Sequence, residues 1–226
     1  DYIEKSDVQQ KSTEVRDTFL EILRAHSGLK SGSDLRSVAN LKERPSSRPD
    51  VIVIGTSTGG PQALVKLLNR LPTDCPPVLV VQHISAKFST ALAERISTVS
   101  GLPIGKMEDG TKLQAGHLYM ALDDYHIAVQ RDRQGLILKL SSDLPMNRHR
   151  PSVDYLFHSL ADAQSSAMAI LLTGMGRDGA VGMKALKDLD AYCVAQSEDD
   201  CVVFGMPREA INLGAANFVG IIDDIR

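Results

Sequence analysis

The sequence contains no tryptophan, and aromatic residues make up only 4% of its 226 residues. Proteins that bind single-stranded nucleic acid stack the bases on aromatic side chains, so this composition argues against such a partner. The formal net charge is -3, which provides no excess of positive charge for nucleic acid or for an anionic membrane. No apolar run approaches the roughly 20 residues that a membrane-spanning helix needs, so we expect no membrane insertion.

Cysteine is also scarce. The three cysteines, Cys75, Cys193 and Cys201, have an odd count and no CxxC spacing. We interpret them as reduced thiols, and not as a disulfide framework or a metal site. The first ten residues, DYIEKSDVQQ, are polar and acidic and do not have the pattern of a signal peptide. We therefore expect a cytoplasmic protein.

The first 50 residues differ in character from the rest. Val15, Phe19, Ile22 and Leu23 share one face of a helix predicted from about residue 12 to 26. The segment that follows is rich in Ser, Pro and charge, which is typical of a linker. An amphipathic helix must pack on something, either the main domain or a domain outside this chain. We divide the chain into residues 1–27, a linker at 28–49 and a main domain at 50–226.

From Val51 onward the pattern is strand, turn, helix, repeated. The predicted strands are 51–54, 78–81, 168–172 and 192–195, and the predicted helices include 61–69, 153–160 and 207–214. Apolar strands that alternate with helices favour a mostly parallel sheet with both faces covered. Three short apolar segments at 118–120, 127–129 and 136–138 indicate antiparallel hairpins added to that sheet. The expected fold class is α/β, a doubly wound, Rossmann-like, mostly parallel sheet with an antiparallel hairpin.

Three polar residues directly follow predicted strands. Ser57 follows the first strand, His83 the second, and Asp178 lies in the turn after the strand AILL. Open parallel sheets bind ligands beyond the carboxyl ends of their strands, so these side chains are expected to meet there. A serine nucleophile needs a base and a carboxylate that orients the base. The three residues therefore predict a nucleophilic hydrolytic site.

The turn at Ser57 has a second interpretation as a phosphate cradle. The dinucleotide fingerprint G-x-G-x-x-G requires a second glycine where this turn, GTSTGG, has Ser57. The lysine of a P-loop is also missing. The pattern G-x-S-x-G, with a strand before it and a helix after it, fits a nucleophile turn better. The order Ser, His, Asp nevertheless differs from that of α/β-hydrolases, which is Ser, Asp, His.

Structural roles for the same residues remain open at this point. Ser57 could cap the helix that enters at Pro61, and His83 could be a hydrogen-bonded core histidine. Asp178 could be the N-cap of the helix after Gly179. His149, in NRHRPSVDYLF, precedes a turn and is the reserve candidate for the base.

Five segments in order and spacing resemble the catalytic domain of the chemotaxis protein-glutamate methylesterases, the CheB family. They are VIVIGTSTGGPQAL, VVQHISAKFS, RPSVDYLFHSLA, AILLTGMGRDGAVGMKAL and AQSEDDCVVFGMPREAI. The resemblance implies a Ser57 nucleophile, a His83 base and an Asp178 carboxylate. It also implies oxyanion donors near Met175, with a contribution from Thr58, and no metal or organic cofactor.

The resemblance further implies that the substrates are glutamate methyl esters, and in many members glutamines, on methyl-accepting chemoreceptors. The opening DYIEKS resembles the end of a response-regulator receiver domain, although Ser6 stands where that pattern usually has Pro. Residues 1–27 would then be the last helix of a receiver that a chemotaxis histidine kinase phosphorylates. The competing hypotheses are a nucleotide-binding α/β module and a catalytically inactive receptor-binding protein.

Overall fold

A computed structural model of the chain describes residues 48–121 and 124–225. The helix and linker predicted within residues 1–47 lie outside this part. Within the described residues, parallel strands form one sheet in the order β3-β2-β1-β6-β7-β8. These strands are β1 (Val51–Thr56), β2 (Val78–Gln82), β3 (Leu118–Met120), β6 (Ala167–Leu171), β7 (Tyr192–Gln196) and β8 (Phe218–Gly220). The doubly wound α/β class predicted from the sequence is confirmed.

The first four residues of β1 are all apolar because the sheet has a hydrophobic core on each face. In β1, Val51 and Val53 enter one core, whereas Ile52 and Ile54 enter the other. Successive side chains of a strand point to opposite faces, so a strand buried on both sides has no polar alternation. This explains the uninterrupted run VIVI in the sequence.

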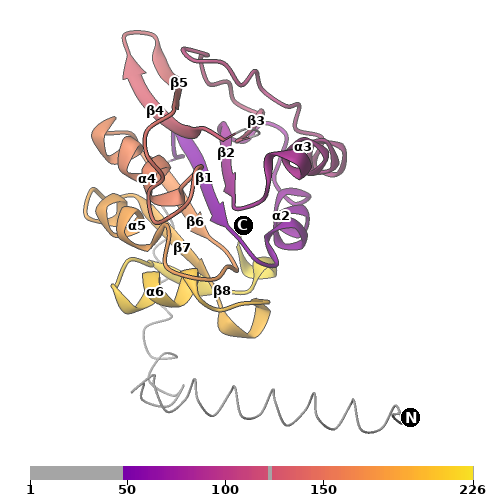
Figure 1. Ribbon diagram of the computed structural model, residues 1–226, viewed down its shortest axis with the longest axis vertical. Helices are drawn as coiled ribbons and strands as arrows, with labels where there is room; N and C mark the ends of the chain where they lie inside the picture. The colour runs from indigo at the N-terminus through magenta and orange to yellow at the C-terminus, as the bar shows by residue number, and fades with distance from the viewer. Residues whose placement is uncertain (1–47, 122–123, 226) are drawn as a thin grey trace, which may run out of the picture. The chain divides into compact units, whose positions relative to one another are not determined.

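Helices cover both faces of the sheet. The helices α2 (Gly60–Leu68) and α3 (Ala86–Ser100) lie on one face. The helices α4 (Val153–Asp162), α5 (Ala180–Lys187) and α6 (Met206–Asn212) lie on the other (Figure 1). Short 3₁₀ turns, η2 (Glu198–Asp200) and η3 (Ile222–Asp224), complete the described elements. None of the described helices is long and apolar enough to cross a bilayer.

The region between α3 and α4 departs from the expectation. The strands β4 (His126–Asp132) and β5 (Gly135–Ser141) form an antiparallel hairpin, as predicted, but a two-stranded sheet of their own. The segment 118–120, expected among the hairpins, is instead β3, which pairs with β2 in parallel, Val78 opposite Leu118. A strand of three residues is too short to reveal its partner by periodicity. The edge strand β8 was not predicted, because its side chains at Phe218 and Val219 are only half-buried.

The strand order reverses at β1, and this reversal positions the site. The strand β1 has β2 on one side and β6 on the other, so the chain winds away in both directions from this point. The last ladder pair between β1 and β2 joins Thr56 to Gln82. The residues after β1, β2 and β6 therefore emerge side by side at one edge, where ligands of open parallel sheets bind.

Candidate active site

Ser57 is the first residue after β1, and main-chain hydrogen bonds tie it to the neighbouring strand ends. The Ser57 N–H donates to the Thr173 carbonyl (N···O 3.0 Å), and the His83 N–H donates to the Thr56 carbonyl (3.0 Å). The chain then turns sharply into α2 through Gly59, which has a φ of 82°. A Cβ at Gly59 would lie 2.6 Å from the Val202 Cβ, so this turn needs glycine for both conformation and space.

His83 and Asp178 form a buried pair beside this turn. The His83 Nε2 and the Asp178 Oδ2 are 2.8 Å apart, and the two side chains are only 8% and 2% exposed. The other ring nitrogen of His83, Nδ1, is buried and has no hydrogen-bond partner among the described residues. No hydrogen bond joins the Ser57 hydroxyl to His83 in this part of the structure. Catalytic hydrogen bonds are often loose without substrate, and Nδ1 is the ring atom left for a serine proton.

The Asp178 carboxylate is held by donors from several directions. Its Oδ1 accepts from the Asn147 Nδ2 (2.8 Å), the Ser152 hydroxyl (2.7 Å) and the Asp154 N–H (3.2 Å). Its Oδ2 accepts from the Val153 N–H (2.7 Å) in addition to His83. Burial alone would raise the pKa of this carboxyl, but the hydrogen bonds from His83, Asn147, Ser152 and Val153 outweigh burial and lower it to about 2. Asp178 is therefore ionised at neutral pH.

The carboxylate sits at the N-terminus of α4, and not of α5. Ser152 is the N-cap of α4, and the N–H groups of Val153 and Asp154 point at Asp178. Helix N-termini stabilise negative charge, which is the role these two N–H groups have here. The N-cap of α5 is Gly179, with no side-chain cap. The alternative interpretation, in which Asp178 is the N-cap of α5, is therefore wrong.

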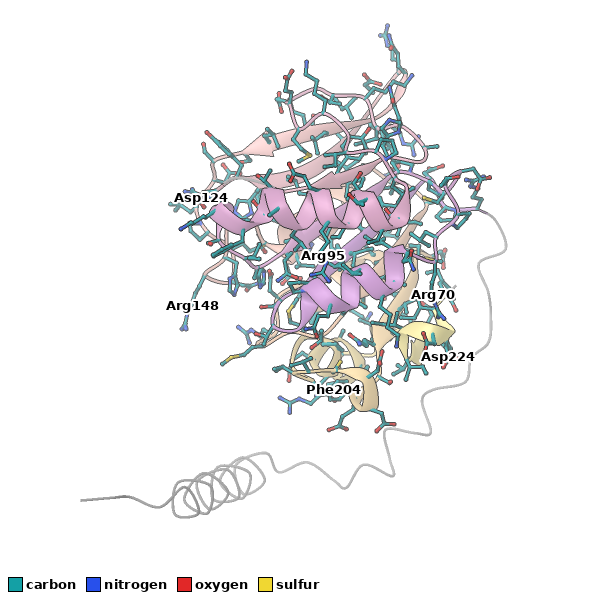
Figure 2. All side chains as sticks on the ribbon, turned by 90° about the vertical axis from the view of Figure 1, so that its right-hand side faces the viewer. Arg70, Arg95, Asp124, Arg148, Phe204 and Asp224 are labelled. Carbon is teal, nitrogen blue, oxygen red and sulfur yellow. The ribbon has the colours of Figure 1, made fainter. Side chains whose placement is uncertain are left out.

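Asn147 reaches the pair from a tight hairpin. Met146 and His149 exchange two main-chain hydrogen bonds, and Asn147 and Arg148 between them have φ values of 54° and 69°. Positive φ at both central positions is the conformation of a type I′ turn, which favours asparagine. The Asn147 amide donates to Asp154 (2.6 Å) as well as to Asp178, so it bridges two buried carboxylates. Arg148 points away from the body of the molecule (Figure 2).

His149, the reserve candidate, lies directly against His83. Their ring centroids are 3.7 Å apart and the rings are nearly parallel, at 9°. Burial, and then the neighbouring His83, lower the pKa of His149, which favours the neutral imidazole. In the structure His83 therefore makes the hydrogen bond to Asp178, and His149 lies over the face of the His83 ring.

The predicted oxyanion donors are the main-chain N–H groups of Thr58, the residue after Ser57, and of Met175, in the turn after β6. The main-chain N–H groups of Thr58 and Met175 have no hydrogen-bond partner within the described part of the chain. Gly174, the neighbour of Met175, packs so closely on the Ser57 turn that a Cβ there would lie 2.8 Å from the Ser57 Cβ. The Gly205 and Met206 N–H groups both donate to the Gly174 carbonyl, which fixes this turn (3.1 and 2.9 Å).

Sequence reasoning missed the residues that support the three candidates. Asn147 and Ser152 both bind Asp178, and buried His126 accepts from the Ser152 N–H at Nδ1 (3.2 Å). The serine before an apolar helical run was a readable N-cap signal, whereas the partners of Asn147 and His126 depend on turn geometry. The described residues contain no group of three or more His, Cys, Asp or Glu that could hold a metal ion.

The fold and the site together define a doubly wound α/β protein with a serine and a buried histidine–aspartate pair at its switch point. The profile of the CheB methylesterase family matches residues 52–226, and the chain belongs to this family. The resemblance found in the sequence is thereby confirmed.

Curated relatives carry the name protein-glutamate methylesterase/protein-glutamine glutaminase. The protein from Hydrogenovibrio crunogenus is 44% identical over 183 residues, which are 79% of this chain and 49% of the relative. That from Chromohalobacter salexigens is 44% identical over 179 residues, 79% of this chain and 51% of the relative. The chain thus spans about half the length of these relatives. The crystal structure of the Thermotoga maritima CheB methylesterase catalytic domain superposes with a TM-score of 0.75 at 34% identity, over 79% of this chain and 95% of that one.

Proposed function

We propose that this chain hydrolyses glutamate methyl esters on the cytoplasmic helices of methyl-accepting chemoreceptors, with Ser57 as nucleophile, His83 as base and Asp178 as orienting carboxylate. One observation carries the proposal: the buried His83–Asp178 pair lies at the strand end bonded to the residue before Ser57, and within the described residues His83 Nδ1 has no hydrogen-bond partner. The printed names of the relatives support the substrate class. The turn GTSTGG lacks the second glycine of a dinucleotide fingerprint, which counts against a nucleotide-binding module. The presence of Ser57, His83 and Asp178 together counts against an inactive receptor-binding protein.

In the first step, His83 Nδ1 accepts the proton of the Ser57 hydroxyl while the serine oxygen attacks the ester carbonyl carbon. The carbonyl oxygen becomes an oxyanion, which accepts hydrogen bonds from the N–H groups of Thr58 and Met175. When the intermediate collapses, the bond from the carbonyl carbon to the methoxy oxygen breaks. The methoxy group leaves as methanol with the proton from His83, and the glutamyl group remains on Ser57 as an ester.

In the second step, water takes the place of serine. His83 accepts a proton from water, the hydroxyl attacks the acyl carbon, and the bond to Ser57 breaks with return of the proton to serine. The products are a glutamate side chain and the free enzyme. The same steps convert a glutamine to glutamate, with ammonia as the leaving group, and we propose this deamidation as a second reaction of the site.

Asp178 keeps the imidazole in the required tautomer throughout. Because its carboxylate accepts from Nε2, the Nε2 nitrogen carries the hydrogen and Nδ1 has the free lone pair. Donors from Asn147, Ser152 and the start of α4 hold the carboxylate ionised, so it also stabilises the imidazolium that forms in each step.

We further propose that residues 1–27 are the last helix of a receiver domain and 28–49 its linker to the catalytic domain at 50–226. Phosphorylation by a chemotaxis histidine kinase would then regulate the enzyme in the cytoplasm. The resemblance of DYIEKS to a receiver end supports this, as does the length of the relatives, about twice the matched segment.

The test is methanol release from a methylated chemoreceptor fragment by this chain and by Ser57→Ala. The proposal predicts stoichiometric methanol and demethylated glutamates with the natural sequence, and release at the uncatalysed rate with Ser57→Ala. A matched control is Ser85→Ala, in the exposed loop two residues after His83, which should retain full activity. Equal rates from the natural chain and Ser57→Ala would refute the assignment of the nucleophile.

A further inference from the structure

Gln82, the last residue of β2, links the two turns that carry the candidate nucleophile and base. Its side chain is buried, with 3% of the residue exposed. Its Nε2 donates to the main-chain carbonyl of Ser57 (2.9 Å) and to that of His83 (3.1 Å). One amide group thus bonds to both turns just beyond the last ladder pair of β1 and β2, next to the bond from the His83 N–H to the Thr56 carbonyl.

The bond to the Ser57 carbonyl has a consequence for the next residue. A peptide unit is planar and trans, so the Ser57 carbonyl and the Thr58 N–H point in opposite directions from one rigid plane. Gln82 and the Gly60 N–H (2.9 Å) both donate to that carbonyl and so fix its direction. By fixing the carbonyl they also fix the Thr58 N–H, which the sequence predicted as an oxyanion donor.

The other end of the same amide indicates that packing alone does not explain this side chain. The Gln82 Oε1 is buried and has no hydrogen-bond partner within the described residues. A buried acceptor without a partner is destabilising, and methionine would fill a similar volume without one. The feature that only a carboxamide provides here is an NH₂ group that donates twice.

We propose that Gln82 is a positioning residue of the proposed hydrolase: its amide aims the Thr58 N–H at the oxyanion and holds the main chain of His83 in register with Ser57. The role rests on the proposed function, because it requires Ser57 to be the nucleophile. Gln82 does not touch the reacting atoms. It acts through two main-chain carbonyls, so its loss affects the transition state more than it affects binding of the substrate.

The first test is Gln82→Met, measured by steady-state methanol release from a methylated chemoreceptor fragment. Removal of a complete oxyanion donor costs about 10² to 10³-fold in turnover, so a misaligned donor is expected to cost about 10 to 100-fold in kcat. KM should stay within about twofold, since the substrate's ground state does not use this donor. A role in packing alone would instead lower Tm and leave kcat per folded molecule unchanged.

A second measurement is independent of the receptor substrate. A fluorophosphonate reacts when the serine oxygen bonds to phosphorus, fluoride leaves and the base takes the serine proton. The phosphoryl oxygen then occupies the oxyanion position. Labelling of Ser57, located by peptide mapping, should slow in Gln82→Met by a factor similar to that in kcat. The control Ser159→Ala removes another part-buried side-chain bond to a main-chain group, in which the Ser159 hydroxyl of α4 accepts from the Val129 N–H of β4 (2.9 Å), and should label at the normal rate.

If Gln82→Met does not fold, Gln82→Glu provides the test. A protonated carboxyl can donate one of the two hydrogen bonds and an ionised one neither. The rate of Gln82→Glu relative to the natural chain should therefore fall as pH rises.

Normal kcat and normal labelling in a folded Gln82 variant would overturn the positioning role while leaving the proposed function standing. If the natural chain releases no methanol and is not labelled at Ser57, both the proposed function and the positioning role of Gln82 are refuted.

Discussion

Asp178 combines strong burial with full ionisation because five donors surround two oxygens. A buried carboxylate without such donors would be protonated at a much higher pH. In the proposed mechanism this charge orients His83 and stabilises its protonated form during turnover. A substitution that removes the charge of Asp178 but keeps the shape of its side chain tests that role most sharply.

We predict that Asp178→Asn lowers turnover on the order of 10⁴-fold, by analogy with the same change in serine proteases. The amide can donate to His83 Nε2, which favours the tautomer with hydrogen on Nδ1 and removes the acceptor that Ser57 needs. The measurement is kcat for methanol release, with circular dichroism to confirm folding. The matched control is Asp188→Asn, an exposed residue at the other end of α5, which should have normal turnover. Near-normal turnover of a folded Asp178→Asn would leave His83 without its proposed partner.

The positions of Ser57, His83 and Asp178 after predicted strands could be read from the sequence. The structure brings all three residues to one edge of the sheet. The role of Gln82 could not be read from the sequence, since a hydrogen bond to a main-chain carbonyl has no signature in the pattern. Asn147 could not be found either. Its contact with Asp178 depends on a left-handed backbone at both central residues of a turn, and one of those residues is arginine.

Among the elements, α4 does most to support the candidate site. Its first N–H groups bind Asp178, and its start approaches closely because Gly179 carries no side chain. A Cβ on Gly179, where φ is 91°, would lie 2.6 Å from the Val153 Cγ1. The N-terminus of α4 and the turn before α5 therefore fit together only with glycine at this position.

We predict that Ser152→Ala lowers the free energy of unfolding by about 1 to 2 kcal/mol, through loss of the N-cap and of the bond to Asp178. Turnover should fall less than about tenfold, because four donors to the carboxylate remain. Chemical denaturation and kcat measure the two effects. Ser85→Ala is the control, since Ser85 is the N-cap of α3 but makes no capping hydrogen bond. A loss below about 0.5 kcal/mol in Ser152→Ala, the ordinary range for surface changes, would contradict the prediction.

The regular elements were largely predictable and the short ones were not. The turn glycines, Pro61 and the apolar periodicity predicted α2, observed at Gly60–Leu68, to within one residue. The strands β3 and β8 have three residues each, too few for a periodic signal, and only tertiary pairing defines them. Residues 118–120 were assigned to a hairpin because Gly and Asp clusters flank them, whereas the neighbouring strand β2 offered a parallel edge.

In the molecule as a whole, His126 connects the hairpin β4–β5 to the site. It is fully buried and stacks on Tyr155, at 4.1 Å between ring centroids. Its Nδ1 accepts from the Ser152 N–H, which requires the neutral ring. Burial lowers its pKa most; Arg150 lowers it further, while the Leu144 carbonyl, Asp143 and Asp178 act in the opposite direction.

We predict that stability falls as pH drops below about 6.5, where histidines in the unfolded chain take up protons. His126 resists protonation in the folded state, so the unfolded chain binds more protons and the free energy of unfolding decreases with falling pH. Denaturation from pH 8 to pH 5 should show this slope, and it should be smaller in His126→Phe, which keeps the ring stack. His149 and Asp154 titrate in both proteins and cancel in the comparison. An identical slope in the two would show that His126 does not contribute.

The central claim is that Ser57 carries the glutamyl group between two chemical steps, and trapping that intermediate tests it most directly. The chain is mixed in excess with a peptide that contains one glutamate methyl ester, quenched in acid within a turnover, and mapped by mass spectrometry. The account predicts early release of methanol and a peptide containing Ser57 that has gained the mass of the substrate acyl group. This adduct should be absent from Ser57→Ala. Methanol release with no adduct on Ser57 at any time within the turnover, or equal release from Ser57→Ala, would contradict the account.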